Sequence, residues 1–129
     1  MMKIKMCKVL PVILATMLLG GCNDDSKADG LTYKAGGGVF YLSQSCVQDA
    51  VLRDVTPPNV FLKITKSETC SEALNKLISD NINNDLVVSF KGKKFLNARI
   101  GSSMKTENGF NLSAPDRKTA QDIYSFYRK

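Results

Sequence analysis

One stretch of the chain decides the fold. Residues 59–100 read NVFLKITKSETCSEALNKLISDNINNDLVVSFKGKKFLNARI. Every second residue in the first part of this stretch is apolar, which places Val60, Leu62 and Ile64 on one face. A period of two residues is typical of a half-buried strand. Apolar residues then recur three and four positions apart over residues 70–78, which predicts an amphipathic helix. A strand followed at once by such a helix is typical of a domain that mixes both element types.

The second part of this stretch, with the residues after it, predicts a hairpin, a strand and a helix. Two β-prone runs, Leu86–Phe90 and Phe95–Ile100, flank the turn sequence Lys91-Gly92-Lys93-Lys94. Gly109–Leu112 predicts one more strand, and a last helix opens at Ser113. The expected fold is therefore α+β, a small antiparallel or mixed sheet with two helices packed on one face.

Both helices carry start signals. Thr69-Cys70-Ser71-Glu72 has the form of a capping box, in which the threonine and the glutamate each satisfy a backbone N–H. In Ser113-Ala114-Pro115-Asp116 the serine is the expected cap, with the proline and the acid in the first turn.

The chain begins like a targeting sequence. Its basic start, MMKIKMCK, is followed by an apolar run over residues 9–21 that is too short for a comfortable membrane span. The run ends in Leu19-Gly20-Gly21-Cys22, which resembles the bacterial lipobox, in whose proteins the cysteine receives a diacylglycerol and the chain is cut before it. We therefore expect a lipoprotein signal peptide over residues 1–21 and a lipid on Cys22. A plain secreted protein with a chance cysteine is the alternative.

The residues after Cys22 are polar and rich in glycine. Residues 22–38 are expected to be a flexible tether, followed by a folded domain over residues 39–129. Removing 21 of the 129 residues leaves 108, and the loss of three lysines lowers the net charge from +6 to +3. Related lipoproteins stay on the periplasmic face of a Gram-negative membrane. In these lipoproteins an aspartate directly after the lipidated cysteine favours retention in the inner membrane. Asn23 occupies that position here, so we expect the protein in the outer membrane rather than in the inner membrane.

The composition excludes much of the common catalytic chemistry. The chain has no histidine, and therefore no Ser-His-Asp triad, Cys-His dyad or histidine-bearing zinc site. We expect a protein that is not an enzyme and that has no cofactor and no metal. A mature charge of +3 without a dense basic patch also weighs against a nucleic-acid partner.

Two cysteines fall in the expected domain. An even pair in an exported domain, Cys46 and Cys70, points to a disulfide, with two separate buried thiols as the alternative.

The hairpin turn and the strand after it form a candidate contact patch. Lys91, Lys93, Lys94 and Arg99 could contact anionic lipid headgroups, peptidoglycan acids or an acidic partner. The alternative is a solvated turn whose lysines guard a strand edge against aggregation.

Residues 39–129 resemble a known family, the head subdomain of the first periplasmic domain of SecD, a subunit of the bacterial protein-export motor. The segments that carry the resemblance are Val60–Ile64, Leu74–Asn81, Leu86–Gly92, Phe95–Ile100 and Gly109–Tyr127, with Gln48-Asp49-Ala50 as the lead-in. No transmembrane helices follow here, so the resemblance implies the binding fold without the proton-driven work.

These observations together predict a lipid-anchored periplasmic module that binds a protein and is associated with the envelope or with export. The membrane is reached through the N-terminal lipid, and the protein partner is unidentified. The alternative is an immunity or inhibitor lipoprotein that neutralises a periplasm-acting toxin or hydrolase.

Overall fold

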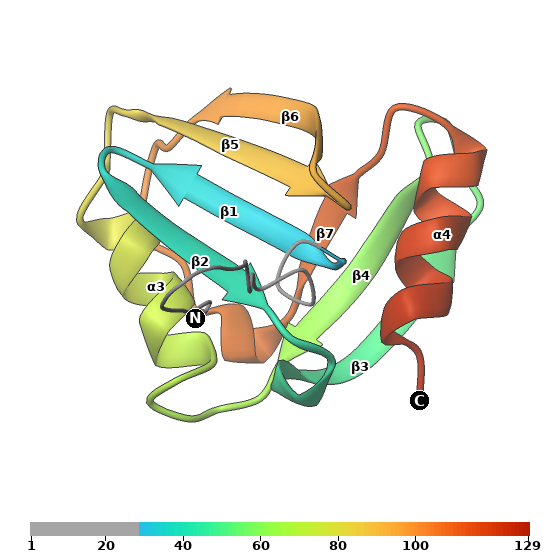
Figure 1. Cartoon of the computed structure of the whole chain (residues 1–129), viewed down its shortest axis with the longest axis horizontal. Coiled ribbons are helices and arrows are strands. Elements are labelled where there is room, and N and C mark those ends of the chain that lie inside the picture. Colours follow the sequence, from blue (N-terminus) through green and yellow to red (C-terminus); the bar gives the residue numbers. More distant parts are fainter. Residues whose placement is uncertain (1–28) are drawn as a thin grey trace, which may run out of the picture.

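The computed structural model describes residues 29–129, which form an α+β fold of two antiparallel sheets and two α-helices (Figure 1). The α+β class predicted from the sequence is confirmed. The elements are β1 (Leu31–Ala35), β2 (Gly38–Leu42), the 3-10 helix η1 (Gln44–Cys46), β3 (Val47–Arg53), β4 (Asn59–Ile64), α3 (Ser71–Ser79), β5 (Asp85–Phe90), β6 (Lys93–Arg99), the 3-10 helix η2 (Thr106–Asn108), β7 (Phe110–Ser113) and α4 (Arg117–Tyr127). The predicted signal peptide and Cys22 lie outside the described residues.

The four-stranded sheet has the order β2-β1-β5-β6. Its register lines up two rows of three buried side chains across β2, β1 and β5: Leu42, Leu31 and Phe90 in one row, and Phe40, Tyr33 and Val88 in the other. These side chains belong to the same core cluster as Val60, Leu62 and Ile64 of β4, in the second sheet. The core of the domain therefore lies between the two sheets.

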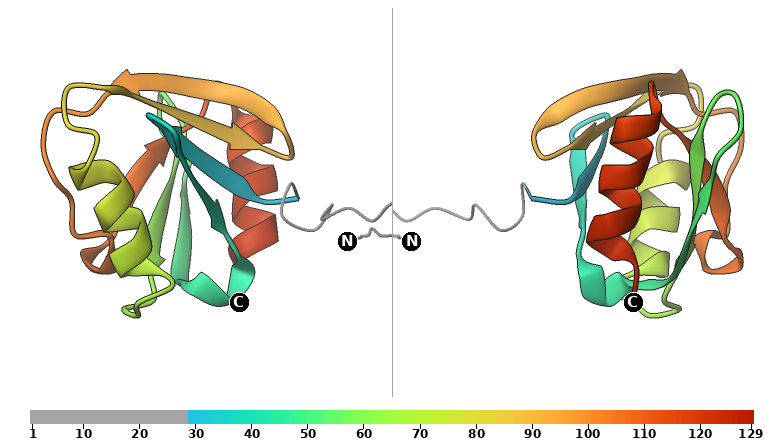
Figure 2. Two further views of the ribbon diagram at one scale, coloured as in Figure 1. Left: turned by 60° about the vertical axis from the view of Figure 1, so that its left-hand side comes forward. Right: turned by 90° about the vertical axis from the view of Figure 1, so that its right-hand side faces the viewer.

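The three-stranded sheet has the order β3-β4-β7, and the two helices lie at opposite ends of the molecule (Figures 1 and 2). Helix α3 packs against β2, and α4 packs against β3 and β4. Each helix buries an apolar stripe, with Leu74 and Ile78 on α3 and Ala120 and Ile123 on α4. Within residues 29–129 no helix is both long and apolar enough to cross a membrane.

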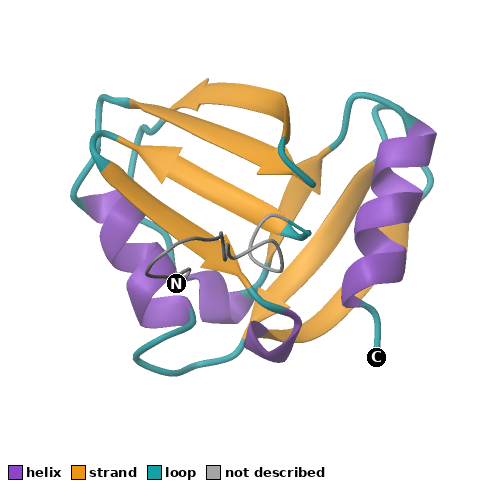
Figure 3. Cartoon of the chain, in the orientation of Figure 1, coloured by secondary structure: helices purple, strands orange, loops and turns teal. Residues whose placement is uncertain are grey.

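The strands are divided between two sheets, whereas the sequence analysis expects one (Figure 3). The reason is that β7 pairs with β4 through Leu112 and Val60, and does not join the β5–β6 hairpin that precedes it. Strand β3, which lacks a clear alternation of apolar residues, also has no counterpart in the prediction. The two helices consequently cover different parts of the fold instead of one common face.

The expectation of a flexible tether over residues 22–38 is wrong for its last part. Leu31–Ala35 form β1, an inner strand of the four-stranded sheet, in which Leu31, Tyr33 and Ala35 are buried. Gly36, with a φ of 57°, lets the chain turn tightly into β2. The glycines that suggested a tether therefore form the turn of a hairpin.

Both helices start differently from the prediction. Cys70 is the N-cap of α3 without a side-chain cap, and the backbone N–H of Glu72 donates to the carbonyl oxygen of Ser67, so the capping box does not form. In α4 the cap is Asp116 and not Ser113, because Asp116 Oδ1 accepts from the backbone N–H of Thr119 at 2.7 Å.

The predicted disulfide is confirmed. Cys46 and Cys70 are bonded, with their Cα atoms 5.3 Å apart, and both are largely buried. The bond joins the start of β3 to the start of α3, so it fixes one helix to the three-stranded sheet.

Candidate functional site: a basic groove

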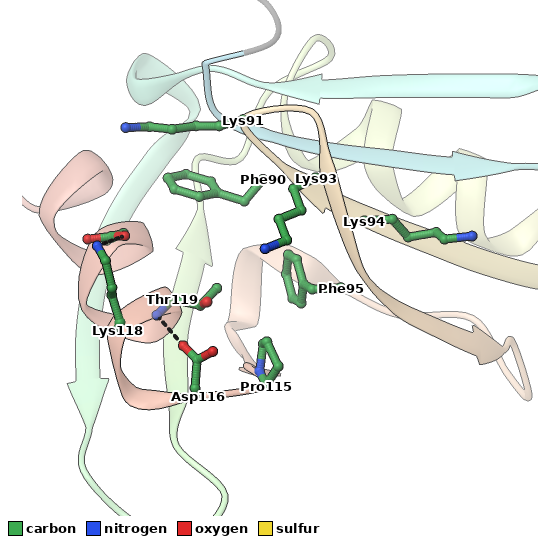
Figure 4. A pocket seen from close by; sticks show the side chains of 10 residues that line it. Phe90, Lys91, Lys93, Lys94, Phe95, Pro115, Asp116, Lys118 and Thr119 are labelled. Atoms are coloured by element: carbon green, nitrogen blue, oxygen red, sulfur yellow. Dashed lines mark hydrogen bonds and ion pairs between the residues drawn. The ribbon is translucent and has the colours of Figure 1, made fainter.

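A groove of about 700 Å³ separates the tip of the β5–β6 hairpin from the first turns of α4 (Figure 4). Its lining residues are Phe90, Lys91, Lys93, Lys94 and Phe95 from the hairpin, and Pro115, Asp116, Lys118, Thr119 and Asp122 from the helix side. Three of the four residues of the predicted basic patch are therefore brought together at one concave surface.

The hairpin turn positions the lysines. Lys91 and Gly92, with φ values of 53° and 81°, make a two-residue turn between the paired residues Phe90 and Lys93. The predicted turn is therefore two residues too long, since Lys93 and Lys94 already belong to β6. Because Lys93 is paired with Phe90, it extends from the same face of the sheet, and Figure 4 shows its side chain directed into the groove.

Phe95 of β6 also lines the groove. It lies two residues after Lys93 and therefore extends from the same face of the strand. The register pairs Ser89 with Lys94 and Val88 with Leu96, which leaves Phe95 as the extra residue of a β-bulge. The bulge breaks the alternation, so Leu96 extends from this face as well, and both side chains pack against the core.

The helix side of the groove supplies two carboxylates, each with one oxygen engaged in a hydrogen bond. Asp116 caps α4, and the hydrogen bonds from Thr119, together with the charges of Lys93 and Lys118, hold the pKa of Asp116 below its usual value. Asp122 accepts a hydrogen bond from Lys118 Nζ at 3.0 Å. Although the Lys93 charge acts on Asp116, none of the hairpin lysines makes an ion pair with a carboxylate among residues 29–129.

The floor of the groove is aromatic and firmly held. The Phe90 ring packs edge to face on Phe126 of α4, with centroids 6.0 Å apart, and Phe126 packs in turn on Tyr127. The Lys91 ammonium lies 5.6 Å from the Phe90 centroid. Four lysines against two aspartates give the lining a net charge of +2, so the groove suits a ligand with both carboxylates and apolar groups.

Arg99, the fourth residue of the predicted patch, does not reach the groove. It is the last residue of β6, in register with Asp85, at the end of the strand away from the turn. The predicted patch therefore runs from Lys91 in the turn along β6 to Arg99, and only its first three residues border the groove.

No sequence pattern identifies Phe95, Pro115 or Lys118 as site residues. Lys118 is separated from the hairpin turn by more than twenty residues, and only the packing of α4 on the second sheet brings it close. Phe95 is recognisable in the sequence only as a strand residue, because nothing local shows that its face borders a groove. Pro115 beside the α4 cap was visible, although only as a helix-start signal.

Other parts of the described structure offer less for ligand binding. Residues 29–129 contain no group of three or more Asp, Glu, His or Cys side chains placed to hold a metal ion. A second, almost wholly apolar cavity of about 160 Å³ lies beside Tyr33, Leu74 and Met104. It has no cluster of polar groups that would orient a substrate.

The fold and the groove together define a small α+β domain with a basic surface groove beside an exposed hairpin. Comparisons with protein-family models, with curated proteins and with solved structures find no match for this chain. The likeness to the SecD head stays a prediction.

Proposed function

We propose that the protein is a lipid-anchored, non-enzymatic binding module at the periplasmic face of the membrane, and that its groove binds an acidic segment of a partner protein. The single observation that carries this proposal is that Lys91, Lys93 and Lys94 border the groove at the hairpin, with Lys93 directed into it beside Phe90 and Phe95, and that none of the three makes an ion pair with a described carboxylate. Such a surface recruits carboxylates by charge and retains them by apolar contact.

A protein segment suits this groove better than a lipid surface or a nucleic acid does. Phe90 and Phe95 line the groove between the lysines and give it apolar surface, which a phosphate group does not fill. A flat layer of headgroups would also fail to fill a concave site. A polypeptide can place acidic and apolar side chains in turn along its length.

The chain enters the fold beside this groove, which supports a role near the membrane. The backbone N–H of Lys91 donates to the carbonyl oxygen of Gly30 at 3.2 Å, so the start of β1 lies against the hairpin turn (Figure 2). From Cys22 to Gly30 the chain can span at most about 28 Å. With a lipid on Cys22, the groove would stay within that reach of the bilayer.

The protein partner is tested by crosslinking in intact envelopes. The wild-type chain is compared with a variant carrying Lys91→Glu, Lys93→Glu and Lys94→Glu, and with a matched control carrying Lys34→Glu, Lys66→Glu and Lys105→Glu, which changes net charge equally outside the groove. We expect one crosslinked partner with the wild type and the control, and at least a tenfold loss with the groove variant. Equal recovery from all three, or no partner at all, would refute the proposal.

The lipid anchor is tested separately by labelling with radioactive palmitate. The wild-type chain should incorporate the label and Cys22→Ala should not. Continued labelling of Cys22→Ala would reject the anchor without affecting the groove.

A further inference from the structure

Strand β6 presents an unpaired edge. It ends the sheet order β2-β1-β5-β6, and its backbone pairs only with β5 among the described elements. In Figure 1 no described segment lies beyond it. Alternate N–H and C=O groups of an edge strand point away from the sheet, so β6 offers a row of hydrogen-bonding groups to another chain.

This edge carries cationic residues at both of its ends. Strand β6 has the sequence KKFLNAR, with three cationic residues and no acidic one, and five of its seven residues are exposed. The register places Lys93 on the groove face and places Lys94 and Arg99 on the opposite, outer face of the sheet. A strand added to this edge would therefore meet cationic side chains on both of its faces.

The three other sheet edges lack this combination. Strand β2 begins at Gly38, where an added Cβ would lie 2.7 Å from Leu77 Cδ1, so α3 crowds that end of the strand. Strand β3 carries Asp49 as well as Arg53, and its charges cancel. Strand β7, with the sequence FNLS, carries no charge. Among the described edge strands, β6 alone combines three cationic residues with no acidic one.

The bulge at Phe95 decides what kind of partner can use the edge. It interrupts the ladder after two residues, which hinders long edge-to-edge pairing between identical chains. Regular pairing resumes over Leu96–Arg99, a length of about 13 Å. A short extended segment can pair there and continue past the bulge into the groove that Lys93 and Phe95 line.

We infer that an acidic, extended segment of the partner protein adds to the sheet as a fifth strand along Leu96–Arg99 and continues into the groove. The inference rests on the proposed function, because it describes how that partner binds. Main-chain hydrogen bonds hold the segment, and carboxylates opposite Lys94 and Arg99 select it. Arg99, which the groove leaves unused, thereby acquires a role in the same surface.

The test uses the mature chain, residues 22–129 with Cys22→Ser, and an eight-residue peptide of alternating glutamate and valine as the probe. Hydrogen exchange of individual amides is followed by NMR with and without saturating peptide. We expect at least two amides within Leu96–Arg99 to exchange at least tenfold more slowly with the peptide bound. Two control peptides are N-methylated at alternate amides, one at the odd-numbered positions and the other at the even-numbered positions. Only one of these two sets of amides can face β6, so one of the two peptides should bind at least tenfold more weakly.

The outcomes separate this inference from the proposed function. One outcome is that peptide binding depends on Lys91 and Lys93, while amide exchange in β6 is unchanged and neither N-methylated peptide binds more weakly. This outcome would overturn the added strand and leave the groove proposal standing. Absence of peptide binding would overturn both. Equal protection of β6 by phosphatidylglycerol vesicles without peptide would assign the edge to a lipid surface and also reject the inference.

Discussion

The hydroxyl of Tyr127 donates a 2.7 Å hydrogen bond to the carbonyl oxygen of Leu42, 85 residues earlier in the chain. The same hydroxyl accepts a 2.7 Å hydrogen bond from the backbone N–H of Leu31. Helix α4 packs on the three-stranded sheet, whereas Leu31 and Leu42 belong to the four-stranded sheet. Tyr127 therefore joins the two sheets at the end where the chain enters the fold.

Tyr127→Phe should lower the free energy of unfolding by about 1–3 kcal/mol, because it leaves a buried N–H and a buried carbonyl without their partner. Urea unfolding followed by circular dichroism measures this loss. Tyr124→Phe is the matched control, since the Tyr124 hydroxyl makes no hydrogen bond to a described residue. Equal losses in the two variants would show that the two hydrogen bonds contribute nothing.

Gly30→Ala should also destabilise the domain. An added Cβ would lie 2.5 Å from the Tyr127 hydroxyl and 2.9 Å from the Phe126 ring, so α4 would have to move away from β1. Overpacking of this kind costs about 1–3 kcal/mol. Gly101→Ala meets no atom within 4 Å and should leave the urea midpoint almost unchanged. A Gly30→Ala midpoint as high as that of Gly101→Ala would contradict the crowding.

The sequence predicts local structure well where periodicity is strong. The alternation over Val60–Ile64 and the stripe from Cys70 to Ile78 identify β4 and α3, and the β5–β6 hairpin follows from its turn glycine. Strand β1 is missed because its three buried core residues, Leu31, Tyr33 and Ala35, stand among glycines and polar residues. Short strands of this kind are determined by the neighbours that they pair with.

The division into two sheets could not be predicted either. Whether β7 joins the hairpin or β4 depends on long-range pairing, which no local pattern in Phe110–Ser113 specifies. The same holds for the site: the lysines of the turn are visible in the sequence, but Pro115 and Lys118 reach the groove only through the packing of α4.

Loss of the Cys46–Cys70 disulfide should lower the stability of the domain by roughly 3 kcal/mol, because the bond closes a loop across 24 positions of the chain. The double variant Cys46→Ala, Cys70→Ala tests this by urea unfolding without reductant. Intact mass with and without reductant should differ by about 2 Da for the wild type. An unchanged mass would contradict the disulfide.

Tyr33→Phe should behave in the opposite way to Tyr127→Phe. The Tyr33 hydroxyl is buried beside the apolar cavity and has no hydrogen bond to any of residues 29–129, and burial together with the Tyr127 charge raises its pKa strongly. Removing an unsatisfied hydroxyl relieves its desolvation cost, so we expect an unchanged or higher free energy of unfolding. A loss above about 1 kcal/mol in urea unfolding would show that the hydroxyl is hydrogen-bonded in solution.

The cap of α4 should make stability depend on pH in the acid range. The Thr119 hydrogen bonds, aided by Lys93 and Lys118, lower the pKa of Asp116 in the folded protein. The ionised Asp116 side chain therefore contributes its full stabilisation above its pKa in the unfolded chain, which is about 4. This stabilisation is lost as the pH falls through the lower pKa that Asp116 has in the folded protein. Asp116→Asn keeps a capping oxygen without a charge, so its melting temperature should approach that of the wild type as the pH falls from 5 to 2. A constant difference between the two melting temperatures over that range would show that Asp116 does not titrate as its contacts imply.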